Sequence, residues 1–340
     1  MATIREVAKI SGVSIATVSQ VLNKGGRPVS EPTRKRVLQA AQTLNYHPNA
    51  MARGLIRSRT DTLGLVYLHN HWPIHNSPSF VRMLDGVLTA GTQLRQDILM
   101  CTSYSWSDGM ANQSVFLDRR CDGFILVAPP LDNEAIPALK ERGIPFVVLC
   151  GQVEDPDVST VDSANVEATG DLMDALFDLG HRRIALVYHQ GELNYSYCMQ
   201  RRMAYRLAHT SRNLIPDPAL EVVFENDASV AALMERPADT RPTAIFGVND
   251  SLAINVMTTL QRAGWEVPAQ VSIVGYDGVD QATMTRPPLA TVQQPFMEIG
   301  ARCIEILLDQ IGNKTRRGEQ VVLPAPFVAR ETLGPPPILY

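Results

Sequence analysis

The stretch TIREVAKISGVSIATVSQVLN, residues 3–23, has the pattern of two short helices joined by a tight turn. Thr3 stands three residues before Glu6, as in a capping box, where the hydroxyl and the carboxylate accept the free amide hydrogens of a first turn. Apolar residues follow at helical spacing. The sequence therefore predicts a first helix from about Ile4 to Ile10.

A second helix is expected after Gly12, which permits a sharp turn, and Ser14, whose hydroxyl can cap residues 15–23. Two helices joined by so short a turn form a helix-turn-helix. At 100° per residue the second helix divides into a packing face and a small, polar face. The packing face holds Val18, Val21 and Leu22, and the other face holds Ala16, Ser19 and Gln20 with Ile15 and Thr17 beside them.

A third helix is predicted within SEPTRKRVLQAAQTLNY, residues 30–46. Ser30 stands where a cap is needed, and Pro32 is tolerated in a first turn. The apolar residues spaced to close a core are Val37, Ala40, Ala41 and Leu44. The amino-terminal region is therefore expected to be a small all-α bundle.

Charge is distributed unevenly along the chain. Residues 1–60 contain ten Lys and Arg but two Asp and Glu, whereas the whole chain has a net charge of −4. A basic head on an acidic body favours contact between the head and a polyanion. A charge run alone is typical of a solvated surface, but combined with the helix-turn-helix and its small exposed face it predicts a reader of the DNA major groove.

The segment NAMARGLIRSRT, residues 49–60, places an apolar Leu55 among arginines. Only about two helical turns could form before Arg57, and Gly54 weakens them by about 1 kcal/mol, so the segment alone is expected to be disordered. One interpretation is a flexible basic linker whose leucine packs on the body. The other is a segment that becomes ordered on DNA, where the leucine unstacks a base step while Arg53 and Arg57 neutralise phosphates.

Composition limits the remaining possibilities. At 340 residues, with 45% hydrophobic and 19% charged residues, the chain is expected to be globular with two or three cores. No apolar run could span a bilayer and MATIREVAKI contains no secretory apolar region, so we expect a cytoplasmic protein without a membrane partner.

The five cysteines form no C-x-x-C pair and are expected to be buried thiols. Neither a G-x-S-x-G elbow nor a G-x-x-x-x-G-K-[ST] loop is present, so neither catalysis nor a cofactor is expected.

From Leu63 onward, short apolar runs rich in β-formers alternate with amphipathic helical stretches, which is typical of parallel sheets in βαβ units. The runs are residues 63–68, 98–102, 123–127 and 146–150, followed by 184–188, 220–224, 243–248 and 271–276. Two such series predict an α/β body of two doubly wound, parallel-sheet lobes. They are expected to divide near STVDSANVEATG, where a helix starts after Val161, and to be joined again at about PLATVQQPF and VVLPAPF.

We therefore expect three regions along the chain. Residues 1–47 form the helix-turn-helix domain, residues 48–60 the hinge, and residues 61–340 the body. Within the body, one lobe comprises about 61–161 and 291–321, and the other about 162–290 and 322–340.

Ligands of open parallel sheets bind beyond the carboxyl ends of the strands. The residues in those places are His69 and Asn70, Ser103 and Tyr104, Pro129, Cys150, His189, Asn249 with Asp250, and Tyr276 with Asp277. This polar set suits hydroxyl groups or a carboxylate.

The loop HNHWPIHN, residues 69–76, needs separate treatment because His69, His71 and His75 could be metal ligands. H-x-H-x3-H in a loop is weak evidence for a metal, and no nearby carboxylate or cysteine completes a ligand set, so no metal site is predicted. The alternatives are that the loop lines a pocket with Trp72 stacked on a ligand, or that Trp72 is a core or interface anchor.

Taken together, TIREVAKISGVSIATVSQVLN and VSEPTRKRVLQAAQTLNYHPNAMARGL resemble the amino-terminal signature of the lactose-repressor (LacI/GalR) family of bacterial transcription regulators. The resemblance implies that the second helix enters the major groove, with Ile15, Ala16 and Gln20 at the bases and Thr17 and Ser19 on phosphates. Gln can pair with adenine, and Ala or Ile can touch a thymine methyl. Family members often carry Arg where Gln20 stands, so we expect a different operator base there.

For the hinge, the resemblance implies that two copies, one from each subunit, fold against each other in the minor groove, where Leu55 wedges between base pairs. The complete set of residues expected at the DNA is Thr3, Ser14, Ile15, Ala16, Thr17, Ser19, Gln20, Asn23, Asn49, Ala52, Arg53, Leu55 and Arg57.

The family pattern continues through the body in LGHRRIALV, GVNDSLAINVM and VSIVGYDG, which implies a body like that of periplasmic binding proteins. Carried over by position, Arg201, Asn249 and Asp277 are expected effector ligands. His69 and Tyr104, which follow predicted strands, and Trp72 of the histidine-containing loop are expected to line the same cleft. Sugar-binding members often have an aspartate where Cys150 stands, and the stretch after EVVF is shortened, so neither a plain hexose nor a purine follows from the resemblance.

We thus expect a homodimeric repressor that binds a palindromic DNA operator and responds to a small molecule, such as a sugar or sugar acid, in the interlobe cleft. Effector identity, the sign of the response, the operator and further assembly of dimers are left open. Two alternatives are a DNA-binding regulator controlled by a protein partner, and a solute-binding or sugar-processing protein. The last would not need the basic helical head.

Overall fold

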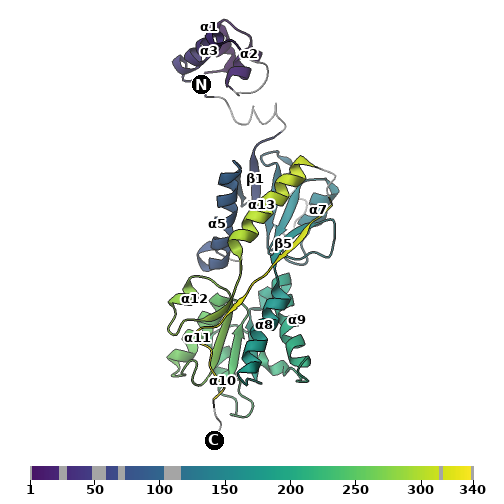
Figure 1. Cartoon of the computed structure of the whole chain (residues 1–340), viewed down its shortest axis with the longest axis vertical. Helices are drawn as coiled ribbons and strands as arrows, with labels where there is room; N and C mark the ends of the chain where they lie inside the picture. Colours follow the sequence, from purple (N-terminus) through teal and green to yellow (C-terminus); the bar gives the residue numbers. More distant parts are fainter. Residues whose placement is uncertain are drawn as a thin grey trace. The chain divides into compact units, whose positions relative to one another are not determined.

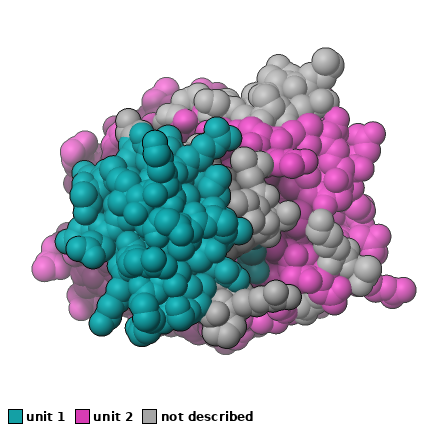
Figure 2. All heavy atoms as spheres, turned by 90° about the horizontal axis from the view of Figure 1, so that it is seen from above, with its two compact units in different colours: residues 1–61 teal, residues 62–340 magenta. Residues whose placement is uncertain are grey.

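The computed structural model of the chain describes residues 2–22, 29–47, 59–67, 73–102, 116–313 and 317–337. The chain forms two compact units, residues 1–61 and residues 62–340 (Figure 1, Figure 2). Among the described residues, none of the helices is both long and apolar enough to cross a membrane.

The first unit consists of α1 (Ile4–Ser11), α2 (Ile15–Leu22) and α3 (Glu31–Thr43). The predicted capping box is present, because the Thr3 amide donates to Glu6 Oε2 at 2.7 Å and the Glu6 amide donates to Thr3 Oγ1 at 3.4 Å. Gly12 adopts φ 66°, which favours glycine. Val7, Val18 and Val37, one from each helix, are fully buried and form the centre of a small core.

The cap of α2 is as predicted, and that of α3 is not. The Thr17 amide donates to Ser14 Oγ at 3.1 Å. Ser30 precedes α3, but its hydroxyl donates to Thr33 Oγ1 at 3.0 Å and makes no backbone cap. The start of α3 therefore depends more on Pro32 in its first turn, whose fixed φ suits that position.

The first lobe of the body is a six-stranded sheet in the order β11-β5-β4-β3-β1-β2, with every pair parallel. Its strands are β1 (Thr62–Val66), β2 (Asp97–Cys101), β3 (Gly123–Val127), β4 (Phe146–Leu149), β5 (Ser159–Ser163) and β11 (Gln320–Leu323). Helices α5 (Pro78–Gln93) and α13 (Phe296–Gly312) pack together on one face, and α7 (Ala135–Glu141) packs on the other (Figure 1). Because both faces are covered, the central strands β3 and β4 are apolar throughout and fully buried.

The second lobe has the strand order β12-β10-β9-β8-β6-β7. Its strands are β6 (Ile184–Tyr188), β7 (Glu221–Val223), β8 (Ala244–Gly247), β9 (Ser272–Asp277), β10 (Ala290–Gln293) and β12 (Phe327–Val328). Its helices are α8 (Asn165–Asp178), α9 (Ser196–Thr210), α10 (Asp227–Met234), α11 (Asp250–Arg262) and α12 (Gln281–Met284). It also contains the short 3-10 helices η2 (Gln190–Asn194) and η3 (Pro218–Leu220), whereas η1 (Ile74–Asn76) belongs to the first lobe. The two-lobed α/β architecture is as predicted.

Three details differ from the sequence-based expectation. The segments expected to be simple crossings contain strands β5, β10, β11 and β12. The last of these runs antiparallel to β10, at the edge of an otherwise parallel sheet. Strand β5 extends to Ser163 and β10 to Gln293, so the chain changes lobe two or three residues later than the approximate limits from the sequence.

Candidate functional site

The helix-turn-helix presents an exposed surface on α2 opposite its packing face. Val18 and Val21 are buried, whereas Ser14, Ile15 and Ala16 are exposed and Thr17, Ser19 and Gln20 are half-buried. Ile15 leaves 45% of its surface exposed, although it is a large apolar residue at the start of a short helix. An exposed aliphatic side chain beside a glutamine amide is suited to contacting a thymine methyl and an adenine edge.

The remaining predicted DNA residues fall into two groups. Thr3 is exposed, and its hydroxyl donates to Glu6 Oε2 at 3.0 Å within the capping box of α1. Asn23, Asn49, Ala52, Arg53, Leu55 and Arg57 lie outside the described residues. The surface of the first unit is also basic, since Arg34, Lys35 and Arg36 of α3 are all exposed.

A cavity of about 850 Å³ lies between the two lobes of the body. The first lobe lines it with residues at or beyond the ends of β3, β4 and β5, including Ala128, Cys150 and Asp162. The second lobe lines it with His189, Asn249 and Asp277, which follow or end β6, β8 and β9. Strand-end residues of both sheets therefore meet at one cavity, as expected for open parallel sheets.

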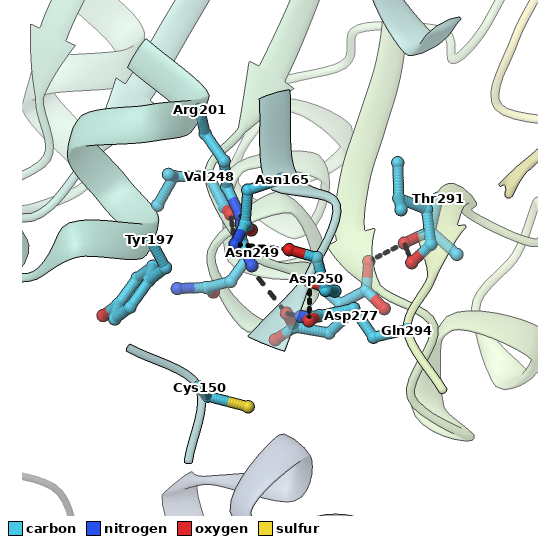
Figure 3. Close-up of polar contacts among 12 residues, drawn as sticks. Cys150, Asn165, Tyr197, Arg201, Val248, Asn249, Asp250, Asp277, Thr291 and Gln294 are labelled. Atoms are coloured by element: carbon cyan, nitrogen blue, oxygen red, sulfur yellow. Dashed lines mark hydrogen bonds and ion pairs between the residues drawn. The ribbon is translucent and has the colours of Figure 1, made fainter. Parts of the chain in front are cut away.

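Arg201 of α9 is the central cation of this cavity (Figure 3). It is 3% exposed, and its Nε donates to Asn165 Oδ1 at 3.0 Å while Nη1 donates to the Val248 carbonyl at 2.7 Å. Nη1 also lies 3.6 Å from Asp277 Oδ1. The guanidinium carbon is 3.5 Å from the centre of the Tyr276 ring, so the planar group is held by stacking as well as by hydrogen bonds.

Asp277 is the last residue of β9 and has an unusual backbone conformation, with φ at 126°. Its Oδ1 accepts a hydrogen bond from Gln294 Nε2 at 2.7 Å, and burial raises its pKa to about 7. Asp250 stabilises the following turn, because its Oδ2 accepts from the Val279 amide at 2.9 Å. A strained residue held in this way is typical of a functional position.

Asn249 has a structural task in addition to lining the cavity. Its Oδ1 caps α11 by accepting from the Leu252 amide at 2.9 Å, and its Nδ2 donates to Glu192 Oε1 at 2.7 Å. Both ends of the amide therefore have protein partners.

Sequence reasoning missed two buried acids in this cavity, Asp162 and Glu192. Asp162 is 1% exposed, and burial raises its pKa to about 6. Glu192 is fully buried, and burial raises its pKa too. The available signal for Asp162 was its position between hydrophobic and small residues in STVDS, which the structure forms into β5.

Aromatic rings complete the cavity lining. Tyr67 stacks on Phe80 with ring centres 3.7 Å apart, and Tyr195 stacks on Tyr197 with ring centres 5.7 Å apart. Of the other predicted lining residues, His69, Trp72 and Tyr104 lie outside the described residues, whereas His75 lines the cavity. Within the described ranges, no three His, Cys, Asp or Glu residues are grouped so as to hold a metal ion.

Hydrogen bonds join the lobes around the cavity. The Leu131 amide donates to the Asn194 carbonyl at 2.8 Å, and the Gln152 amide donates to Ser196 Oγ at 3.0 Å. On the side of α5, Arg82 Nη1 donates to the Gly278 carbonyl at 2.7 Å, one residue beyond Asp277. The two lobes are therefore in direct contact around the cavity.

Comparison with known families gives two matches. Residues 3–49 match the model for bacterial regulatory proteins of the lacI family, and residues 173–333 match a periplasmic binding protein-like domain. These matches cover the helix-turn-helix and most of the second lobe.

Among curated proteins, the chain is similar to the HTH-type transcriptional repressor PurR of Vibrio campbellii, with 32% identity over 98% of this chain and 99% of the relative. It is 33% identical to PurR of Vibrio cholerae serotype O1 over 98% of both chains. These alignments span nearly the whole length of both chains.

Several solved structures have a similar fold. A complex of the transcriptional regulator CelR with cellobiose has a TM-score of 0.72 and 28% identity, covering 98% of this chain and all of that chain. The Lac repressor dimer bound to operator and the anti-inducer ONPF has a TM-score of 0.80 and 24% identity, covering 97% of this chain and 98% of that one. A LacI-family regulator from Enterococcus faecium with bound ribose has a TM-score of 0.67 and 26% identity, covering 81% of this chain and 99% of that one.

Proposed function

The chain belongs to the LacI family of bacterial regulatory proteins and is a DNA-binding transcriptional repressor. From this premise we propose that a small molecule in the interlobe cavity controls its affinity for an operator. The observation that carries the proposal is the cavity itself, where Arg201 and Asp277 face strand-end residues of the other lobe. Cavities of several hundred Å³ with a few converging polar groups are typical of small-molecule sites.

The DNA-binding part of the proposal concerns the exposed face of α2. Ile15, Ala16 and Gln20 contact bases in the major groove, and Thr17 and Ser19 contact phosphates. The exposure of Ile15 and Ala16 and the basic surface of α3 support this assignment. A single module of this size buries too little surface for operator affinity, so the chain acts as a homodimer on a palindromic site.

The proposed organisation assigns residues 1–47 to DNA reading, 48–60 to the hinge and 61–340 to effector binding and dimerisation. In the hinge, Leu55 enters a base step of the minor groove, and Arg53 and Arg57 neutralise nearby phosphates. Two hinges, one from each subunit, become ordered together on the operator.

In the effector site, Arg201 donates hydrogen bonds, Asp277 accepts them and Asn249 positions the neighbouring Glu192. His69, Trp72 and Tyr104 are proposed to complete the lining. A ligand can change operator affinity only if it binds the open and closed lobe arrangements with different affinity. The structure contains interlobe hydrogen bonds of Arg82, Leu131 and Gln152, and we propose that they are made in the closed arrangement and lost in the open one.

The experiment has two stages. Fluorescence anisotropy with genomic DNA fragments at several salt concentrations is expected to show binding that weakens steeply with salt, since phosphate contacts release counterions. A thermal-shift library of small molecules then identifies compounds that raise the unfolding temperature, and each is tested for its effect on operator affinity. Binding without salt dependence, or stabilising compounds without any effect on the operator, would contradict the proposal.

A further inference from the structure

Among the cavity-lining residues that the structure describes, carboxyl groups outnumber buried cations. Among the described lining residues, Asp162, Glu192 and Asp277 are all at least nine-tenths buried, and the guanidinium buried with them is that of Arg201. Arg262 also lines the cavity, but it is exposed at the end of α11. Burying carboxylates without matching cations is costly, so the cavity has an affinity for positive charge.

The buried guanidinium of Arg201 is already engaged within the second lobe. Arg201 Nη1 approaches Asp277 and donates to Val248, and Nε donates to Asn165. The Glu192 carboxylate is satisfied by hydrogen bonds, since Oε2 accepts from the His189 amide at 2.8 Å and Oε1 from Asn249. These two donors are neutral groups, so the nearby guanidinium of Arg201 is shared between Glu192 and Asp277.

Asp162 is the acid with an unused acceptor. Its Oδ1 accepts from the Ser163 amide at 2.7 Å, whereas Oδ2 is buried without a hydrogen-bond partner among the described residues. A buried carboxylate oxygen without a donor is costly, and such atoms in folded proteins usually have a ligand or partner that completes them. Asp162 belongs to the first lobe and Arg201 to the second. A ligand that completes Asp162 would therefore contact the first lobe.

The aromatic rings favour the same kind of partner. The negative face of an aromatic ring attracts cations, and Arg201 already uses two rings in this way, Tyr276 at 3.5 Å and Tyr197 at 5.1 Å from the ring centres. Tyr67 and Tyr195 also line the cavity. Carboxylates combined with tyrosine faces form an environment for an ammonium group.

We propose that the effector of this cavity is a small, hydroxylated molecule bearing a protonated amine, such as an amino sugar, whose ammonium donates to Asp162 Oδ2. This inference rests on the proposed function, because it names the ligand class of the same site. The hydroxyl groups bind the remaining acceptors of Glu192 and Asp277. The three acids disfavour a carboxylate ligand, which argues against the sugar acids allowed by the sequence.

The test uses the full-length chain and compares ligands that share one carbon skeleton but differ in charge. D-glucosamine, D-glucose and D-glucuronate are included in a wider thermal-shift library of amines, neutral polyols and carboxylates, and every stabilising compound is titrated by calorimetry. We expect the stabilising compounds to be amines that bind at least about tenfold more tightly than their neutral counterparts. A library in which no amine stabilises the chain, or in which neutral or anionic compounds bind more tightly, overturns the proposal.

Two variants locate the ammonium. Asp162→Asn is expected to weaken binding of the amine by about 10- to 100-fold and to leave binding of a neutral polyol nearly unchanged. Asp171→Asn, on the exposed face of α8, is the matched control with unchanged affinity. Glu192→Gln is the second variant should Asp162→Asn fail to fold, and it is expected to weaken amine binding in the same direction. Equal amine affinity in the wild type and the folded variant overturns the assignment.

Failure of the ligand class and failure of the proposed function give different results. If a neutral or anionic compound binds the cavity and changes operator affinity, the repressor mechanism stands and the amine inference is wrong. If an amine binds in an Asp162-dependent way but operator affinity does not change, the ligand class stands and effector control is wrong.

Discussion

The buried carboxyl group of Asp162 makes a quantitative prediction about the ligand-free protein. The perturbation is Asp162→Asn, which removes the charge but keeps an oxygen that can accept from the Ser163 amide. Because Oδ2 has no hydrogen-bond partner among the described residues, the substitution is expected to remove a cost rather than an interaction. The variant is therefore expected to be more stable than the wild type near neutral pH.

The magnitude follows from the pKa of this group. Burial raises the pKa of Asp162 from 3.8 to about 6, so the folded state binds this proton more tightly than the unfolded state does. A group with a raised pKa destabilises the folded state progressively as the pH rises from about 4 to about 6. Each tenfold difference in proton affinity is worth about 1.4 kcal/mol, so the cost reaches about 3 kcal/mol at pH 8 and is about 1 kcal/mol at pH 4.5.

The groups around Asp162 do not obscure this difference. Burial raises the pKa of Cys150 well above its ordinary value and that of Tyr276 to about 12, so neither changes charge below pH 8. Arg201 stays protonated throughout. The pKa of Asp277 lies in the same range. Because Asp277 is present in both the wild type and Asp162→Asn, its contribution to the free energy of unfolding largely cancels in the difference between them.

The assay is urea unfolding of the ligand-free, full-length chain at pH 4.5 and pH 8, for wild type, Asp162→Asn and the surface control Asp171→Asn. We expect a gain in the free energy of unfolding for Asp162→Asn that is about 2 kcal/mol larger at pH 8 than at pH 4.5. The control should show no such change. A variant that is less stable than wild type at pH 8, or whose difference is the same at both pH values, would show that the protein itself compensates the carboxylate.

Three further substitutions test other parts of the molecule. Ser14→Ala removes the cap of α2 and should cost about 1 kcal/mol, seen as faster hydrogen exchange of the first amides of α2; unchanged exchange would refute it. Leu55→Ala should lower operator affinity at least about tenfold in anisotropy titrations without changing the circular dichroism of the chain. Unchanged affinity would refute the insertion of Leu55 between base pairs. Arg82→Ala loses the 2.7 Å bond to the Gly278 carbonyl and should weaken effector binding about two- to tenfold, whereas the ion pair with the 71% exposed Asp280 contributes little. Unaltered effector affinity would exclude Arg82 as a contact that stabilises closure.

The helix-turn-helix was predictable because its signals are local. The Thr3 and Glu6 capping box, the turn at Gly12 and the cap at Ser14 each act within four residues, and all are present in the structure. Ser30 was misjudged because a hydroxyl near a helix start can bond a neighbouring side chain as easily as a backbone amide.

The strands at the lobe crossings were missed because their formation depends on distant partners. β5 reads Ser-Thr-Val-Asp-Ser, which has little apolar character, yet it is fully buried between β4 and β11. β11 follows it by more than 150 residues in the chain, so no local pattern reports the pairing. Strand preference of this kind reflects the neighbouring strands more than the residues themselves.

The site was predicted only in part for the same reason. The rule that ligands bind at the carboxyl ends of strands located Asn249 and Asp277, and the family resemblance indicated Arg201. All three come from the second lobe. Asp162 lies inside an unrecognised strand and Glu192 in the short turn η2, and their convergence on Arg201 exists only after folding.

This division of the site between lobes determines what a ligand must do to regulate. Arg201, Asn249 and Asp277 belong to one lobe, so a ligand held by them alone has the same contacts whether the lobes are open or closed, and it cannot shift their equilibrium. Asp162 belongs to the other lobe, and beside it Ser163 Oγ donates to Gln294 Oε1 at 2.7 Å where the chain passes between the lobes. A contact with Asp162 that exists only in the closed arrangement shifts the equilibrium tenfold for each 1.4 kcal/mol or so that it contributes. Ligand selectivity and regulation therefore depend on the same carboxylate, and Asp162→Asn should reduce the effect of a bound amine on operator affinity even at concentrations that saturate the variant.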